Sequence, residues 1–301
     1  MPTTDPRSAP QLLRVDGRDI RYDVEGTGEP VLLLHGIGRS LDDWNLVRDT
    51  LAERHTVYRV DLPGFGGSER LPARTDLAGL AAAVIAFLDA VEEVRRIRVV
   101  GNSLGGAVAM QIAATRPERV AALVLVNSAG FGREVTPVLR LIAVPGVGRR
   151  LLMPSRESAR RETRGIFHDR AQVTEERVQL AYDLARRPHG TDVMLETVHA
   201  LGTWRGIRPR WRRELLDIVR AHRIPTLLIW GENDLVLPAA HLAAAKAVFP
   251  EARSHLFAAT GHMPQLERPD EFLEVVGEFL DTITPTPATT PPATPPTEDT
   301  A

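Results

Sequence analysis

The feature that most constrains this chain is a serine held between glycines at the end of a short apolar run. Residues 97–106 read Ile-Arg-Val-Val-Gly-Asn-Ser-Leu-Gly-Gly, which places Gly-x-Ser-x-Gly around Ser103. The pattern is typical of a strand that turns sharply into a helix with serine at the apex, because small neighbours let other backbone pass close by. The flanks agree: residues 95–100 predict a buried strand, and 104–115 predict a helix that ends before Pro117.

The composition limits the classes of protein that the chain can belong to. With 301 residues, of which 43% are hydrophobic and 25% charged, it can bury a full core. The formal net charge of −2 gives no reason to expect a nucleic-acid partner. The lack of cysteine excludes disulfides, thiolate metal sites and a cysteine nucleophile. Without a signal-peptide core at the start or a bilayer-length apolar run, we expect a cytoplasmic protein with no stable membrane insertion.

Strand and helix patterns alternate along the first part of the chain. Residues 11–26 predict a hairpin around an Asp-Gly turn. Ser40 and Asp43 predict a capped start for a helix that runs to about residue 53. The other expected elements are buried strands at 30–34, 55–60 and 121–126 and a helix at 76–91.

The alternation stops between residues 131 and 220. Only helical patterns are recognisable there, separated by prolines. This stretch holds 18 arginines and 11 acidic residues, so it is formally +7 while the remainder of the chain is −9. We therefore predict a helical insertion with its own charge balance.

The final part of the chain resumes the alternation. A strand at 224–230 leads to Asp234, and a strand at 252–258 leads to His262. Helices are expected at 238–249 and 269–280. Threonine and proline dominate after residue 282, which predicts a disordered tail.

With these motifs in this order, the chain resembles the α/β-hydrolase superfamily over roughly residues 11–281. Ser103, Asp234 and His262 follow that family's order. The resemblance implies an α/β fold in which helices flank a mostly parallel eight-stranded sheet and a helical cap is inserted. The implied organisation is a flexible N-terminus (1–10), a hydrolase core (11–130 and 221–281), a cap (131–220) and a disordered tail (282–301).

The resemblance also assigns roles to the three side chains. Ser103 would be the nucleophile, His262 the general base and then acid, and Asp234 the carboxylate that orients the imidazole. Glu232, two residues before Asp234, is a rival for the last role. The oxyanion hole would be the backbone N–H groups of Ile37 and Leu104. Neither a metal nor a cofactor is implied.

Several other residues have two interpretations each. Trp44 can line the pocket or pack a helix, and Met263, directly after His262, is a second candidate pocket residue. We expect His35 to shape its loop by hydrogen bonding and Asp61 to form a turn. The arginine-rich insertion can attract acidic substrates or form a solvated surface.

These residues predict a cofactor-independent serine hydrolase that cleaves a carboxylic ester of an apolar or aromatic small molecule. One alternative is a carbon–carbon bond hydrolase of a ring-fission product. That branch of the superfamily shares Gly-Asn-Ser-x-Gly-Gly, as at 101–106, but usually has tryptophan where this chain has Met263. Another alternative is a hydrolase-fold receptor that binds a small ligand with little turnover. The oligomeric state is not predicted.

Overall fold

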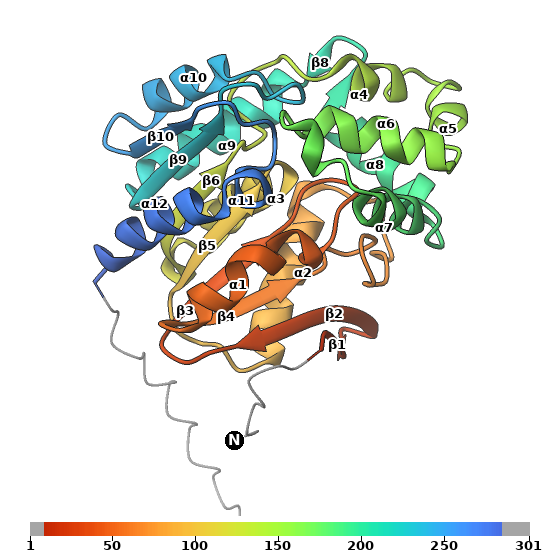
Figure 1. Cartoon of the computed structure of the whole chain (residues 1–301). Helices are drawn as coiled ribbons and strands as arrows, with labels where there is room; N and C mark the ends of the chain where they lie inside the picture. Colours follow the sequence, from red (N-terminus) through yellow and green to blue (C-terminus); the bar gives the residue numbers. More distant parts are fainter. Residues whose placement is uncertain (1–8, 285–301) are drawn as a thin grey trace, which may run out of the picture.

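Eight strands form the central sheet of the protein, a computed structural model of which describes residues 9–284. Most of the flexible N-terminus and disordered tail expected from the sequence lies outside the described residues. The strands run in the order β1-β2-β4-β3-β5-β6-β9-β10 (Figure 1). Their bounds are Gln11–Val15 (β1), Arg18–Glu25 (β2), Glu29–Leu34 (β3), His55–Val60 (β4), Ile97–Asn102 (β5), Val120–Val126 (β6), Thr226–Gly231 (β9) and Arg253–Phe257 (β10).

The sheet is mostly parallel, as predicted. Only the pairs β1–β2 and β2–β4 are antiparallel. The β1–β2 hairpin turns at Asp16 and Gly17, which both have positive φ, as a two-residue turn of this kind requires. From β4 to β10 every pair is parallel, so the carboxyl ends of these strands meet at one edge. Ligand sites of open α/β sheets lie at such an edge.

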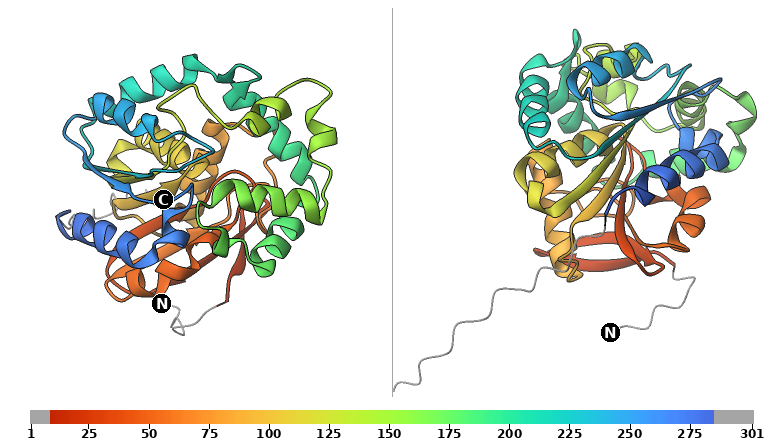
Figure 2. Two further views of the ribbon diagram at one scale, coloured as in Figure 1. Left: turned by 45° about the horizontal axis from the view of Figure 1, so that its top comes forward. Right: turned by 90° about the vertical axis from the view of Figure 1, so that its left-hand side faces the viewer.

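Helices cover both faces of the sheet (Figure 2). One face carries α2 (Leu77–Ala90), α3 (Leu104–Thr115), α9 (Pro209–Ala221) and α10 (Ala240–Val248). The other carries α1 (Asn45–Ala52), α11 (Pro264–Glu267) and α12 (Pro269–Asp281). Successive residues of β3 alternate between the two cores: Leu32 and Leu34 pack on the first face, and Val31 and Leu33 on the second. This alternation follows from the two-residue period of a strand and explains why the strand is apolar throughout.

The start of the first helix differs from the prediction. Ser40 is followed by a 3₁₀ helix, η1 (Leu41–Trp44), and its hydroxyl donates to the Asp42 carboxylate instead of capping backbone amides. Asp43 accepts hydrogen bonds from the Arg39 guanidinium. The two polar residues are therefore part of a side-chain network.

The segment between β6 and β9 is almost entirely helical. It contains five helices before α9 and, against expectation, a hairpin of two-residue strands whose shortness leaves no periodicity to detect. The bounds are Pro137–Ile142 (α4), Gly148–Leu151 (α5), Arg156–Ile166 (α6), Glu175–Ala185 (α7), Gly190–Leu201 (α8), Gly202–Thr203 (β7) and Gly206–Ile207 (β8). A short 3₁₀ helix, η3 (Arg170–Gln172), lies between α6 and α7, and another, η2 (Pro117–Arg119), precedes β6.

The last helix of the predicted cap is part of the core packing. Leu215, Leu216 and Val219 of α9 lie in the hydrophobic core that contains α3, and the two helices are in contact. A cap that ends at residue 220 would therefore include α9, a helix that packs like the helices of the core. That the preceding helices act as a cap stays a prediction. None of the helices between residues 9 and 284 has the length and apolar character needed to cross a bilayer.

Candidate active site

Ser103 lies at the tight turn between β5 and α3, with φ of 55° and ψ of −112°. A Cβ atom at Gly101 would come within 2.3 Å of the Gly105 carbonyl oxygen, and one at Gly105 within 2.2 Å of the Leu34 carbonyl oxygen. Both positions therefore require glycine for the close approach of backbone. The Ser103 amide donates to the Val126 carbonyl oxygen at 2.9 Å, which fixes the strained turn to the neighbouring strand.

Asp234 and His262 meet at the carboxyl edge of the sheet. The His262 Nδ1 and Asp234 Oδ2 atoms are 2.7 Å apart, and both side chains are buried. The other carboxylate oxygen of Asp234 accepts the amides of Val236 and Leu237. Since an ionised carboxylate only accepts hydrogen bonds, Nδ1 carries the proton in this pair and Nε2 is left as the basic nitrogen.

The rival carboxylate, Glu232, makes a different contact. It is exposed and accepts the Ala259 amide at 3.2 Å. Among residues 9–284, the acidic side chain that bonds the His262 ring is Asp234.

Two asparagines donate hydrogen bonds to Asp234 and His262. They were not identified as site residues from the sequence. Asn127 Nδ2 donates to Asp234 Oδ2 at 2.7 Å, and Asn102 Nδ2 donates to the His262 carbonyl oxygen at 3.1 Å. Asn127 follows β6 with φ of 45°, a conformation that asparagine tolerates better than most residues. The sequence feature that could have identified Asn127 is its position directly after a buried strand, at the sheet edge where Asp234 and His262 were expected.

The backbone amides of Ile37 and Leu104 flank the serine. Leu104 is the first residue of α3, and Ile37 belongs to the loop after β3. In the described part of the chain, neither amide donates a hydrogen bond and the Ser103 hydroxyl has no protein partner. Free amides at a helix start attract negative charge, so an oxygen beside Ser103 could accept from them.

The Ser103 side chain faces an apolar pocket. Leu139 of α4, Ala143 directly after that helix, Val198 and Leu201 of α8, and Trp211 of α9 contribute to its wall. None of its lining residues is charged; the others are Ile37, Leu104, Ala129, Val135, Gly202, Thr203, Gly206, Ile207, Val236 and Leu237. The wall thus suits an apolar group and offers no side-chain cation to a carboxylate.

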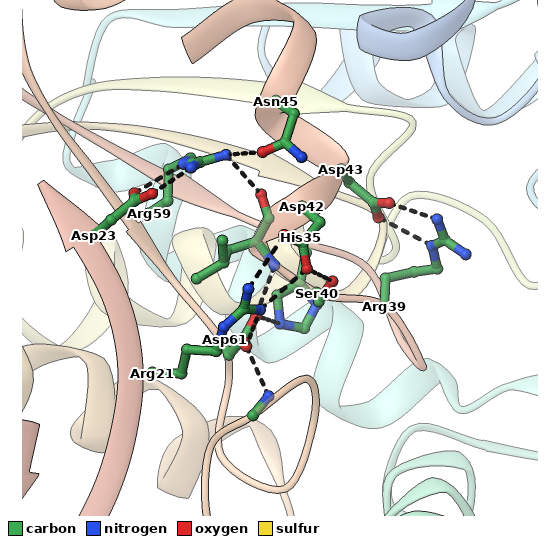
Figure 3. Close-up of polar contacts among 12 residues, drawn as sticks. Arg21, Asp23, His35, Arg39, Ser40, Asp42, Asp43, Asn45, Arg59 and Asp61 are labelled. Atoms are coloured by element: carbon green, nitrogen blue, oxygen red, sulfur yellow. Dashed lines mark hydrogen bonds and ion pairs between the residues drawn. The ribbon is translucent and has the colours of Figure 1, made fainter. Parts of the chain in front are cut away.

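The His35 loop rests on a buried polar network (Figure 3). His35 Nδ1 donates to the Gly36 carbonyl oxygen at 2.7 Å, and its Nε2 accepts the Leu62 amide at 2.9 Å. Burial lowers the pKa of His35, which keeps the imidazole neutral and matches these roles. Its expected part in shaping the loop thus agrees with its contacts.

Asp61 forms the turn expected of it and ties three segments together. One carboxylate oxygen accepts the Leu41 amide at 2.6 Å, and the other accepts the Gly67 amide and the Arg21 guanidinium. Arg21 also pairs with Asp42. The paired charges of Asp61, Arg21 and Asp42 therefore help to fix the loop that carries the Ile37 amide.

Trp44 and Met263 do not line the pocket that Ser103 faces. Trp44 is fully buried and packs beside Phe272, so its helix-packing interpretation is the correct one. Met263 packs with Ile166 and Phe167 in a small separate cluster. The sequence could not decide this, because both residues are apolar and lie close to site residues along the chain.

The loop of His262 is bonded to the helical segment above it. The His262 amide donates to the Ile166 carbonyl oxygen at 2.8 Å. Glu267 accepts the Gly261 amide with one oxygen and the His168 and Asp169 amides with the other.

No group of three or more potential metal ligands occurs within residues 9–284.

The family model for the alpha/beta hydrolase fold matches residues 29–269, which is most of the chain. The protein is a member of the α/β-hydrolase family. This agrees with the sheet order, the serine turn and the positions of Asp234 and His262 at the carboxyl edge.

Known relatives of this hydrolase have varied activities. A dihydrolipoyllysine-residue acetyltransferase component of the acetoin cleaving system from Cupriavidus necator is 36% identical over 92% of this chain and 70% of its own length. A 2-hydroxymuconate semialdehyde hydrolase from Pseudomonas sp. (strain CF600) is 32% identical over 91% of this chain and 96% of its own. The crystal structure of a membrane phospholipase A is similar with a TM-score of 0.74, at 27% identity over 91% of this chain and 86% of that one. Membership of the family therefore does not select the bond that is cleaved.

Proposed function

We propose that this hydrolase cleaves a carboxylic ester of an apolar or aromatic small molecule through an acyl-enzyme formed at Ser103. The observation that carries the proposal is the uncharged, apolar lining of the pocket that Ser103 faces. A pocket of this kind binds an apolar group by removing it from water and does not need a charged partner.

The proposed reaction uses the Ser103 hydroxyl together with the hydrogen-bonded pair of His262 and Asp234. His262 Nε2 takes the proton from the Ser103 hydroxyl as its oxygen attacks the ester carbonyl carbon. The negative charge that develops on the carbonyl oxygen is stabilised by the Ile37 and Leu104 amides. The imidazolium, held by Asp234, then protonates the departing alkoxide, and a water molecule hydrolyses the acyl-enzyme by the same steps.

A carbon–carbon hydrolase is the second candidate, favoured by the similarity to a 2-hydroxymuconate semialdehyde hydrolase. Its ring-fission substrate would carry a carboxylate. The pocket lining contains no arginine, lysine or histidine to bind that group, which favours the neutral ester.

A panel of nitrophenyl esters with acyl chains of increasing length tests the proposal. We expect hydrolysis by the wild-type protein, and a loss of about 10⁶ in kcat for Ser103→Ala. The melting temperature of the variant controls for folding. Turnover of a vinylogous diketone acid without turnover of any ester would select the carbon–carbon hydrolase, and equal ester turnover by Ser103→Ala would refute the role of Ser103.

A further inference from the structure

Half of the large exposed hydrophobic side chains of residues 9–284 gather on one side of the helical segment. Six of the twelve lie on α4, on α5, directly before or just after α5, and at the β7–β8 turn. Their exposed fractions run from 37% to 69%. We call this set the cap patch: Val138, Leu141, Val147, Leu151, Met153 and Trp204.

The two parts of the cap patch are joined by a direct contact. The Arg140 side chain on α4 donates from Nε to the Trp204 carbonyl oxygen at the β7–β8 turn, at 2.9 Å. Helices α4 and α5 also contact each other and α8. Figure 1 shows α4, α5 and β8 along the outer rim of the cap, on the far side of the molecule from β1. The patch is thus one surface and not a set of scattered residues.

Two of the elements that carry the cap patch, α4 and the β7–β8 hairpin, also contribute to the wall of the Ser103 pocket. On α4, Leu139 lines the pocket whereas Val138 and Leu141 are exposed. At the hairpin, Thr203 lines the pocket whereas the next residue, Trp204, is 52% exposed. One layer of chain therefore separates the exposed apolar surface from the apolar pocket.

The chain segment that carries most of the cap patch is basic. Residues 137–154 contain Arg140, Arg149 and Arg150 and no acidic residue. Arg149 pairs with the exposed Asp192 on α8. At the hairpin, the guanidinium of Arg205 lies 4.7 Å above the ring of Trp204. Exposed apolar side chains with arginines at their border are the composition of surfaces that bind the interface of an anionic membrane.

We propose that the cap patch docks on the surface of an anionic phospholipid bilayer. The six apolar side chains enter the interface and the arginines bind headgroup phosphates. Helix α4 and the β7–β8 hairpin then lie between the lipid and the pocket, so an apolar ester passes from the bilayer to Ser103 with little exposure to water. This route rests on the proposed esterase function, whereas the docking itself does not.

A second copy of the chain fits the cap patch less well. A two-fold contact would bring the same surface of each subunit together. Arg140 and Arg150 of one subunit would then approach the same residues of the other, and residues 137–154 contain no acidic residue to pair with them. Repulsion between like charges opposes that contact, whereas an anionic surface neutralises them.

Vesicle co-sedimentation with the full-length wild-type protein tests the docking. We expect a partition coefficient on phosphatidylglycerol vesicles about 100-fold higher than on phosphatidylcholine vesicles at low salt, falling as salt is added. The paired substitution Leu141→Glu with Met153→Glu should lower the partition by about tenfold or more. The matched control is Ile218→Glu with Leu12→Glu, which places the same two charges at exposed apolar residues outside the patch and should leave binding unchanged.

The outcomes separate the docking from the esterase function. All of these variants should hydrolyse a short, water-soluble nitrophenyl ester at the wild-type rate, because none of the changed residues lines the pocket. Soluble-ester hydrolysis without vesicle binding would overturn the docking alone, and vesicle binding without any ester hydrolysis would overturn the esterase function alone. Equal binding by the wild type and the paired variant would also overturn the docking, as would a dimer that the paired substitution dissociates.

Discussion

Next to the His35–Gly38 loop, charged side chains are buried and paired, whereas on the cap patch apolar side chains are exposed. Asp61 is fully buried and neutralised by Arg21 and two amides. Met153 is 69% exposed. The difference separates two requirements: the loop must hold the Ile37 amide in one position, and the patch keeps apolar area free for a partner. Buried charges serve the first because they tolerate few alternative arrangements.

The largest effect is expected for Asp61→Ala. The substitution removes the buried carboxylate that accepts the Leu41 and Gly67 amides and pairs with Arg21, and it leaves the buried Leu41 amide without its acceptor. We expect the free energy of unfolding, measured in urea, to fall by about 3–5 kcal/mol. The control is Asp49→Ala, whose carboxylate is 73% exposed beside Arg48 and should change stability by less than about 1 kcal/mol. Equal losses would show that the loop does not depend on its buried charges.

Next in size is the effect of Asn127→Gly on turnover. Glycine keeps the positive φ of this position but removes the donor to Asp234 Oδ2. A hydrogen bond to a charged group contributes about 1.5–3 kcal/mol, so kcat/KM for a nitrophenyl ester should fall about 10-fold to 100-fold. Asn233→Ala, beside Asp234 in sequence, should stay within about twofold of the wild type. An unchanged kcat/KM for Asn127→Gly would contradict a positioning role.

The pH dependence of stability tests the buried imidazole of the loop. Burial lowers the pKa of His35, so the folded protein keeps it neutral while the unfolded chain takes up a proton below about pH 6.5. Stability therefore falls as the pH falls from about 6.5 toward the folded pKa, with a slope of up to about 1.4 kcal/mol per pH unit from this group. His35→Gln should reduce the measured slope of unfolding free energy against pH, whereas substitution of the exposed His222 by Gln should not. A steeper or unchanged slope for His35→Gln would show that this group does not titrate as described.

The smallest effect is expected on the cap patch in the absence of lipid. Leu141 is 51% exposed, so Leu141→Ala should change the free energy of unfolding by less than about 0.5 kcal/mol. Ile142, its neighbour on α4, is only 4% exposed, and Ile142→Ala should cost about 2–5 kcal/mol. The reverse ranking would mean that α4 turns its other face to solvent.

The sequence predicts what local patterns encode. The turn at Ser103, the Asp-Gly hairpin and the helix 104–115 each depend on neighbouring residues, and the structure has all three. Ser103, Asp234 and His262 each follow a predicted strand. Because the carboxyl ends of parallel strands lie at one edge of a sheet, the sequence predicted that these residues lie at the same edge.

Contacts between distant residues could not be predicted in this way. Asn127 reaches Asp234 across 107 positions, and nothing near either residue encodes the pairing. Whether Trp44 faces the pocket or the core depends on the direction of a one-turn 3₁₀ helix, which its composition leaves open. The same holds for α9, which follows the helical insertion in sequence but packs on α3.

The central claim is that Ser103 is a nucleophile activated by His262, which Asp234 holds in place. Labelling of the full-length protein with a fluorophosphonate, followed by intact-mass and peptide analysis, tests this most directly. We expect one adduct per chain, on Ser103, and none on the Ser103→Ala variant. No adduct on the folded wild-type protein, or an equal adduct on the variant, would contradict the claim.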